Sequence, residues 1–108
     1  MYRGDRMVQV KEITPAETEK RMKEDHVEVI DVREDEEVAQ GMIEGASHIP
    51  LGDIPDAVDR LDKEKEYILV CRSGRRSLHA AKFLAKQGFN VTSMSGGMLK
   101  WEGDVIQK

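Results

Sequence analysis

The stretch YILVCRSGRRSLHAAKFLAKQG, residues 67–88, predicts a buried strand, a tight turn and a helix in succession. Residues 67–70 form a short apolar run of the kind that parallel sheets bury on both faces. Apolar residues then recur at helical spacing, and Gly88 is a typical helix end. The residues expected on the buried face of this helix are Leu78, Ala81 and Leu84 or Ala85. A strand followed directly by an amphipathic helix indicates an α/β fold.

The rest of the chain repeats this alternation. Further strands are expected at residues 8–13, 27–32, 47–49 and 90–94. Helices are expected within residues 14–25, 33–41, 53–61 and 96–103. Thr14, Pro15 and Glu17 match a capping box with proline in the first turn, and Asp53 is a candidate cap of its helix. Strands that alternate with helices predict a mainly parallel sheet.

Length and composition narrow the kinds of protein this chain can be. Its 108 residues suit one domain, so residues 1–108 are expected to form a single unit. The net charge of −4 argues against nucleic-acid binding. No apolar run approaches the roughly 20 residues of a membrane helix, and the first ten residues lack the apolar core of a signal peptide. We expect a cytoplasmic monomer that binds neither nucleic acid nor membrane.

Cys71 is the only cysteine and follows the predicted strand directly. It can form no internal disulfide, which suits a reducing compartment. One cysteine and three scattered histidines do not supply the four ligands of a structural zinc site, so we expect no metal and no cofactor. The carboxyl end of a strand in an open α/β sheet is where ligands bind. A cysteine buried as a small core residue remains the alternative.

The residues after Cys71 suit the binding of an anion. Gly74 permits a tight turn in which successive N–H groups point inward, and the start of the helix adds positive potential. Arginines in a first helical turn oppose the helix dipole, which an anion at this place would relieve. The expected anion-binding residues are Arg72, Ser73, Gly74, Arg75, Arg76 and Ser77, with Arg76 and Arg72 as the main side-chain contacts.

The same features favour a thiolate at Cys71. We expect its pKa in the lower part of the range of about 3.5–7.5 that helix N-termini and cations produce. Such a nucleophile needs no histidine base. His79 does not share a helix face with Ser77, and His26 and His48 are also expected to be non-catalytic.

Four motifs in order resemble those of the single-domain rhodaneses, a family of sulfurtransferases. The motifs are VIDVRE (29–34), GMIEGASHIPL (41–51), CRSGRRS (71–77) and GGMLKW (96–101). The resemblance covers about residues 10–104. It implies a rhodanese-like three-layer α/β/α fold with a central sheet of about five strands. Met42 departs from the pattern, because the family commonly has histidine there, and no proline follows Trp101.

The resemblance also implies a mechanism. Cys71 would take sulfane sulfur from a small anionic donor such as thiosulfate, hold it as a persulfide, and pass it to cyanide, a thiol or a partner protein. Backbone N–H groups of the 72–77 loop would stabilise the anion. Asp31 and Arg33 would support the site, although an ordinary structural ion pair explains them better. No second cysteine is present, so an external acceptor must remove the sulfur.

Other functions remain open from the sequence. Cysteine-dependent phosphatases and arsenate reductases use a similar cradle, but they place five residues between cysteine and arginine, whereas four separate Cys71 from Arg76. A binding module would not need the intact loop. A persulfide carrier with little turnover of small donors is harder to distinguish. Met98 and Trp101 are expected to close the core, and the acidic run at 33–40 to face solvent.

Overall fold

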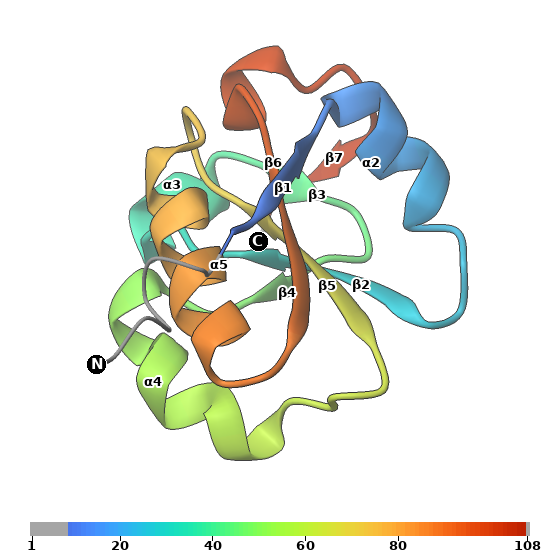
Figure 1. Cartoon of the computed structure of the whole chain (residues 1–108). Helices are drawn as coiled ribbons and strands as arrows, with labels where there is room; N and C mark the ends of the chain where they lie inside the picture. The colour runs from blue at the N-terminus through green and yellow to red at the C-terminus, as the bar shows by residue number, and fades with distance from the viewer. Residues whose placement is uncertain (1–8, 108) are drawn as a thin grey trace.

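The predicted alternation of strands and helices is present along the chain (Figure 1). The computed structural model describes residues 9–107, so Val8 of the first predicted strand lies outside the described residues. The strands are β1 (Lys11–Ile13), β2 (Val27–Asp31), β3 (Met42–Ile43), β4 (Ser47–His48), β5 (Glu66–Val70), β6 (Asn90–Met94) and β7 (Val105–Ile106). The α-helices are α2 (Pro15–Arg21), α3 (Asp35–Ala39), α4 (Ile54–Ala57) and α5 (Arg75–Lys86). The 3-10 helices are η1 (Leu51–Asp53), η2 (Val58–Arg60) and η3 (Gly97–Lys100).

Five strands form one parallel sheet in the order β1-β6-β5-β2-β4. The connection from β5 through α5 leads to β6 on one side, whereas that from β2 through α3 leads to β4 on the other. The chain therefore changes direction between β2 and β5. In open α/β sheets such a switch leaves a crevice at the carboxyl ends of the two strands. Asp31 pairs with Val70 in register, so both strands end at the same edge.

Helices cover both faces of the sheet, which confirms the three-layer fold. One core joins β2, β5 and β6 to α4 and α5 (Figure 1). Its fully buried members include Ile30, Leu69, Ile54, Ala81 and Leu84. The other core lies on the opposite face, under the end of α2, η3 and Trp101. Its members include Val29, Ile68, Val70 and Met94, with Met22, Met98 and Trp101 packed against them.

The two long helices differ in how well the sequence predicted them. In α2 the Thr14 hydroxyl accepts the amide of Glu17, and the Glu17 carboxylate accepts the amide of Thr14, which confirms the capping box. In α5 the buried face is Ser77, Ala80, Ala81 and Leu84. Leu78 is only half-buried, so its predicted place on that face is wrong. The face is rotated because the Ser77 hydroxyl, and not Leu78, points at the sheet.

Two further features differ from the sequence prediction. Asp53 ends η1 in a helical conformation, and its side chain caps nothing, because η1 runs directly into α4. A second, two-stranded sheet joins β3 to β7 in antiparallel pairing, with Met42 opposite Ile106. Strands of two residues carry no readable alternation, so this pairing left no sequence signal. Met42 itself is buried.

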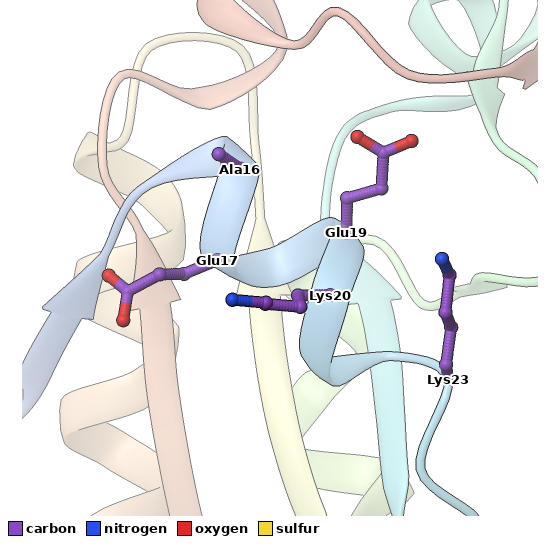
Figure 2. Close-up of a pocket in the computed structure, with 5 residues that line it drawn as sticks. All are labelled: Ala16, Glu17, Glu19, Lys20 and Lys23. Carbon is purple, nitrogen blue, oxygen red and sulfur yellow. The ribbon is translucent and has the colours of Figure 1, made fainter.

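One hollow of the described surface lies away from the sheet edge and is lined by α2. It measures about 340 Å³ and runs along the outer side of this helix. Its lining residues are Ala16, Glu17, Glu19, Lys20 and Lys23. Figure 2 shows the four charged side chains spread around the helix instead of converging on one point. Between residues 9 and 107, no helix is both long and apolar enough to cross a membrane.

Candidate active site

Cys71 lies one residue beyond β5, at the edge where β2 also ends. The amide of Val32 donates to the carbonyl of Val70, which extends the β2–β5 pairing to this point. The Cys71 residue is fully buried. It touches the apolar core below and the loop of residues 72–77 above. Burial alone does not distinguish an inert core cysteine from a reactive one. The groups around the sulfur decide between the two.

Backbone amides of the loop are directed at the sulfur. The amide of Gly74 donates to Cys71 Sγ at 3.0 Å, and the backbone groups of Ser73 and Ser77 also lower the pKa of the thiol. Gly74 has φ +106°, a conformation that L side chains rarely adopt, and it is the N-cap of α5. The loop thus folds as a concave anion site joined to a helix N-terminus.

The outer side of the same loop is held by η3. The amide of Met98 donates to the carbonyl of Cys71 at 2.8 Å, and the amide of Leu99 to that of Arg72 at 3.0 Å. A trans peptide unit points its N–H opposite to its carbonyl, so anchoring these carbonyls outward turns the next amides inward. Gly97 makes this approach possible, because a Cβ there would overlap the carbonyl oxygens of Cys71 and Arg72.

Two buried hydroxyls complete the surroundings of the sulfur. Ser77 Oγ lies 3.5 Å from Cys71 Sγ and 3.2 Å from the carbonyl of Gly74. Ser93 Oγ, from β6, lies 2.8 Å from Ser77 Oγ. Both serines are fully buried. Polar groups thus meet at the sulfur although it lies inside the protein.

Burial of Cys71 raises the pKa of its thiol, but hydrogen bonds outweigh that effect. They come from the Ser77 hydroxyl and from the amides of Ser77, Gly74 and Ser73. The pKa of Cys71 therefore lies below its ordinary value. This direction agrees with the expectation from the sequence, and it identifies backbone and hydroxyl groups, more than arginines, as the cause.

The arginines of the loop differ from one another. Arg76 forms a two-pronged ion pair with Glu37 of α3, with N–O distances of 2.7 and 2.8 Å. This hydrogen-bonded pairing lowers the pKa of Glu37 to about 2. Arg75 is exposed. Arg72 is exposed and lines a depression of about 240 Å³ beside the loop. The depression is lined by Arg33, Glu37, Gln40, Arg72, Met98 and Leu99.

Asp31 and Arg33 form a buried ion pair at the end of β2. Arg33 donates through Nε and Nη2 to the Asp31 carboxylate at 3.0 and 2.9 Å, and its amide donates to the same carboxylate. Arg33 Nη2 also donates to the carbonyl of Gly41 at 2.7 Å. The ring of His48 bonds the carbonyl of Arg33. These contacts fix the turn between β2 and α3.

Sequence reasoning missed three residues of the site. Glu37 was assigned to a solvated acidic face, Ser93 to a buried strand and Gly97 to a turn. Ser93 carried a usable signal, since a hydroxyl inside an apolar strand needs a partner. Glu37 carried none, because its partner Arg76 is 39 positions away.

The chain is similar in sequence to proteins of a known family. The family model for the rhodanese-like domain matches residues 14–104. YtwF of Bacillus subtilis, provisionally named a sulfurtransferase, is 48% identical over 102 residues, covering 94% of this chain and 99% of its own. The thiosulfate sulfurtransferase GlpE of Pseudomonas putida is 32% identical and covers 88% of this chain and 87% of its own.

A solved structure of the same family has a similar fold. The rhodanese-like domain protein of Staphylococcus aureus superposes with a TM-score of 0.85 at 34% identity, covering 92% of this chain and 99% of that one. Sequence and fold thus point to the same group of proteins. The chain belongs to the rhodanese-like domain family.

Proposed function

We propose that this protein transfers sulfane sulfur through a persulfide on Cys71, from an anionic donor such as thiosulfate to a thiol, cyanide or a protein acceptor. The Cys71 thiolate attacks the outer sulfur of thiosulfate. A sulfur–sulfur bond to Cys71 forms, the bond to the sulfonate group breaks, and sulfite leaves with the bonding electrons. An acceptor nucleophile then attacks the outer sulfur of the persulfide, and the Cys71 thiolate is the leaving group.

The observation that carries this proposal is the Gly74 amide, which donates to Cys71 Sγ at 3.0 Å. Fixed dipoles aimed at the sulfur stabilise it both as nucleophile and as leaving group, so they assist both half-reactions. Arg72 is the exposed cation at the depression and is assigned to the approach of the donor.

Two observations favour a second candidate, a persulfide carrier that turns over small donors slowly. Cys71 is fully buried, and the guanidinium of Arg76 already binds the carboxylate of Glu37. Both features hinder a free anionic donor. Such a carrier would load sulfur on Cys71 but release little thiocyanate in the presence of thiosulfate and cyanide.

The first prediction is that thiosulfate adds one sulfur atom to the wild-type protein in intact-mass analysis. The gain should vanish on reduction and be absent from Cys71→Ser, because Cys71 is the only cysteine. Thiocyanate production measured in parallel separates enzyme from carrier. If wild type gains no sulfur from thiosulfate or from an inorganic polysulfide, the proposed function is wrong.

A further inference from the structure

Ser93 is a buried polar residue close to the sulfur but not in the loop. It lies in β6 opposite Leu69 of β5, two positions before Cys71. It is fully buried. Within residues 9–107, its hydroxyl bonds only to Ser77 Oγ, at 2.8 Å. A hydroxyl in an apolar interior is unfavourable unless it is hydrogen-bonded, so the bond to Ser77 is what makes a serine tolerable at this strand position.

The hydrogen-bond capacity of Ser77 shows what Ser93 can do. A hydroxyl donates one hydrogen and accepts two. Ser77 Oγ has three neighbours: Cys71 Sγ, Ser93 Oγ and the carbonyl of Gly74. When Cys71 is a thiol, every bond is satisfied if Cys71 and Ser93 both donate to Ser77, and Ser77 donates to Gly74.

When Cys71 loses its proton, rotation of the Ser77 hydroxyl alone is enough to give the thiolate a hydrogen-bond donor. The hydrogen of Ser77 turns from the carbonyl of Gly74 to the sulfur. The carbonyl is not left without a donor, because the amide of Leu78 also bonds to it at 3.3 Å. Ser93 keeps donating to Ser77, and it thereby polarises the hydroxyl that now donates to the thiolate.

We propose that Ser93 is a positioning residue for sulfur transfer, whose hydroxyl donates to Ser77 and so directs the hydrogen of Ser77 to the Cys71 thiolate. Its effect on the thiol is independent of the donor and acceptor. Only its effect on turnover rests on the proposed function. The competing explanation is that Ser93 merely fills space beneath the loop.

The test measures the thiol pKa of Cys71 from the pH dependence of its alkylation by iodoacetamide. Cys71 is the only thiol, so every alkylation event reports it. Ser77→Ala removes a direct partner and should raise the pKa by about one unit. Ser93→Ala acts indirectly and should raise it by about 0.3–0.5 unit.

A double-mutant cycle tests whether Ser93 acts through Ser77. Ser93→Ala should cause no further pKa shift when Ser77 is already alanine. Thr92→Val is the matched control, because Thr92 is a buried hydroxyl on the same strand that bonds to Glu66 instead. This variant should leave the thiol pKa at the wild-type value.

The variants Ser93→Thr and Ser93→Val distinguish the effect of side-chain shape from that of hydrogen bonding. Their side chains have the same shape, but only threonine has a hydroxyl. The threonine variant should keep a lower thiol pKa than the valine variant, even if both are less stable than wild type. Equal pKa values in this pair, or a Ser93→Ala shift that persists without the Ser77 hydroxyl, would overturn the proposal. Because sulfur donors are not used, these outcomes do not depend on whether thiosulfate is a substrate.

Discussion

At the scale of single residues, Cys71 is subject to two opposed effects. Burial disfavours the charged thiolate, whereas one hydroxyl and three amides favour it, and the hydrogen bonds prevail. A buried cysteine without such donors would be inert. The same side chain is thus a packing residue or a nucleophile according to the direction of its neighbouring peptide groups.

Gly97 provides a prediction at this scale. In Gly97→Ala the new methyl group meets the carbonyls of Cys71 and Arg72, and φ +59° is unfavourable for alanine. The Cys71–Arg72 backbone must then shift, at a cost of about 1–3 kcal/mol in the free energy of unfolding. We expect sulfur transfer to fall at least as severely as stability, measured by urea denaturation and thiocyanate production.

Gly52→Ala is the control for this prediction, because nothing lies within 4 Å of the Cβ it would add. It should behave as wild type in both measurements. A Gly97→Ala protein with wild-type activity and a wild-type alkylation profile would show that anchoring the carbonyls outward does not orient the amides.

Much of the chemistry at this scale was predictable. Cys71 and Gly74 lie in one continuous loop, so their relation is local and visible in the sequence. The partners of Arg76 and Ser77 come from α3 and β6, and only the tertiary fold brings them close. The sequence indicated that Arg76 would bind an anion, but not that Glu37 supplies a carboxylate there.

At the scale of elements, the Glu37–Arg76 pair joins α3 to the first turn of α5. It neutralises the guanidinium that an anionic donor would otherwise meet. We expect Glu37→Gln to lower the KM for thiosulfate by about two- to five-fold, the range for a partly exposed ion pair. Steady-state kinetics with varied thiosulfate measure this.

Glu36→Gln tests whether the effect is specific. Glu36 is an exposed neighbour on the same helix, and the change in net charge is identical. Its KM for thiosulfate should stay near the wild-type value. If the two variants lower KM equally, the cause is the overall charge and not the release of Arg76.

The strands and helices themselves were largely predictable, since each has a local cause. The capping box begins α2, and apolar runs identify β2 and β5. The rotation of α5 was not predictable, because Leu78 is more apolar than Ser77 and hydrophobicity alone places it inside. The hydrogen bond between Ser77 of α5 and Ser93 of β6 places Ser77 inside instead.

At the scale of the whole molecule, the parallel sheet brings the ends of β2 and β5 together. The sequence predicted the fold class and the parallel arrangement. It did not predict the order β1-β6-β5-β2-β4, because contacts between strands far apart in the chain leave no local pattern.

The lowered pKa of Cys71 links the site to the stability of the whole fold. The unfolded chain has an ordinary thiol, with a pKa of about 8.5. A group whose pKa is depressed by folding stabilises the protein fully above its unfolded pKa, and this contribution is lost as pH falls through the folded pKa. The expected gain is about 1.4 kcal/mol for each unit of depression.

The free energy of unfolding of wild type should therefore rise relative to that of Cys71→Ser between pH 6 and pH 9. Urea denaturation of both proteins at each pH measures the difference, in which the contributions of other groups cancel. A difference that stays constant or shrinks as pH rises would contradict a depressed pKa in the folded state.

The contacts from η3 to the loop also bear on biosynthesis. Met98 and Leu99 lie 27 positions beyond the residues whose carbonyls they bind. A ribosome that has translated only as far as Met94 has already made β6, but the segment that orients the peptide groups around the sulfur does not yet exist. The nascent chain therefore carries an ordinary, weakly ionised thiol. The thiol keeps this ordinary character until Met98 and Leu99 have been added and have bound the carbonyls of Cys71 and Arg72.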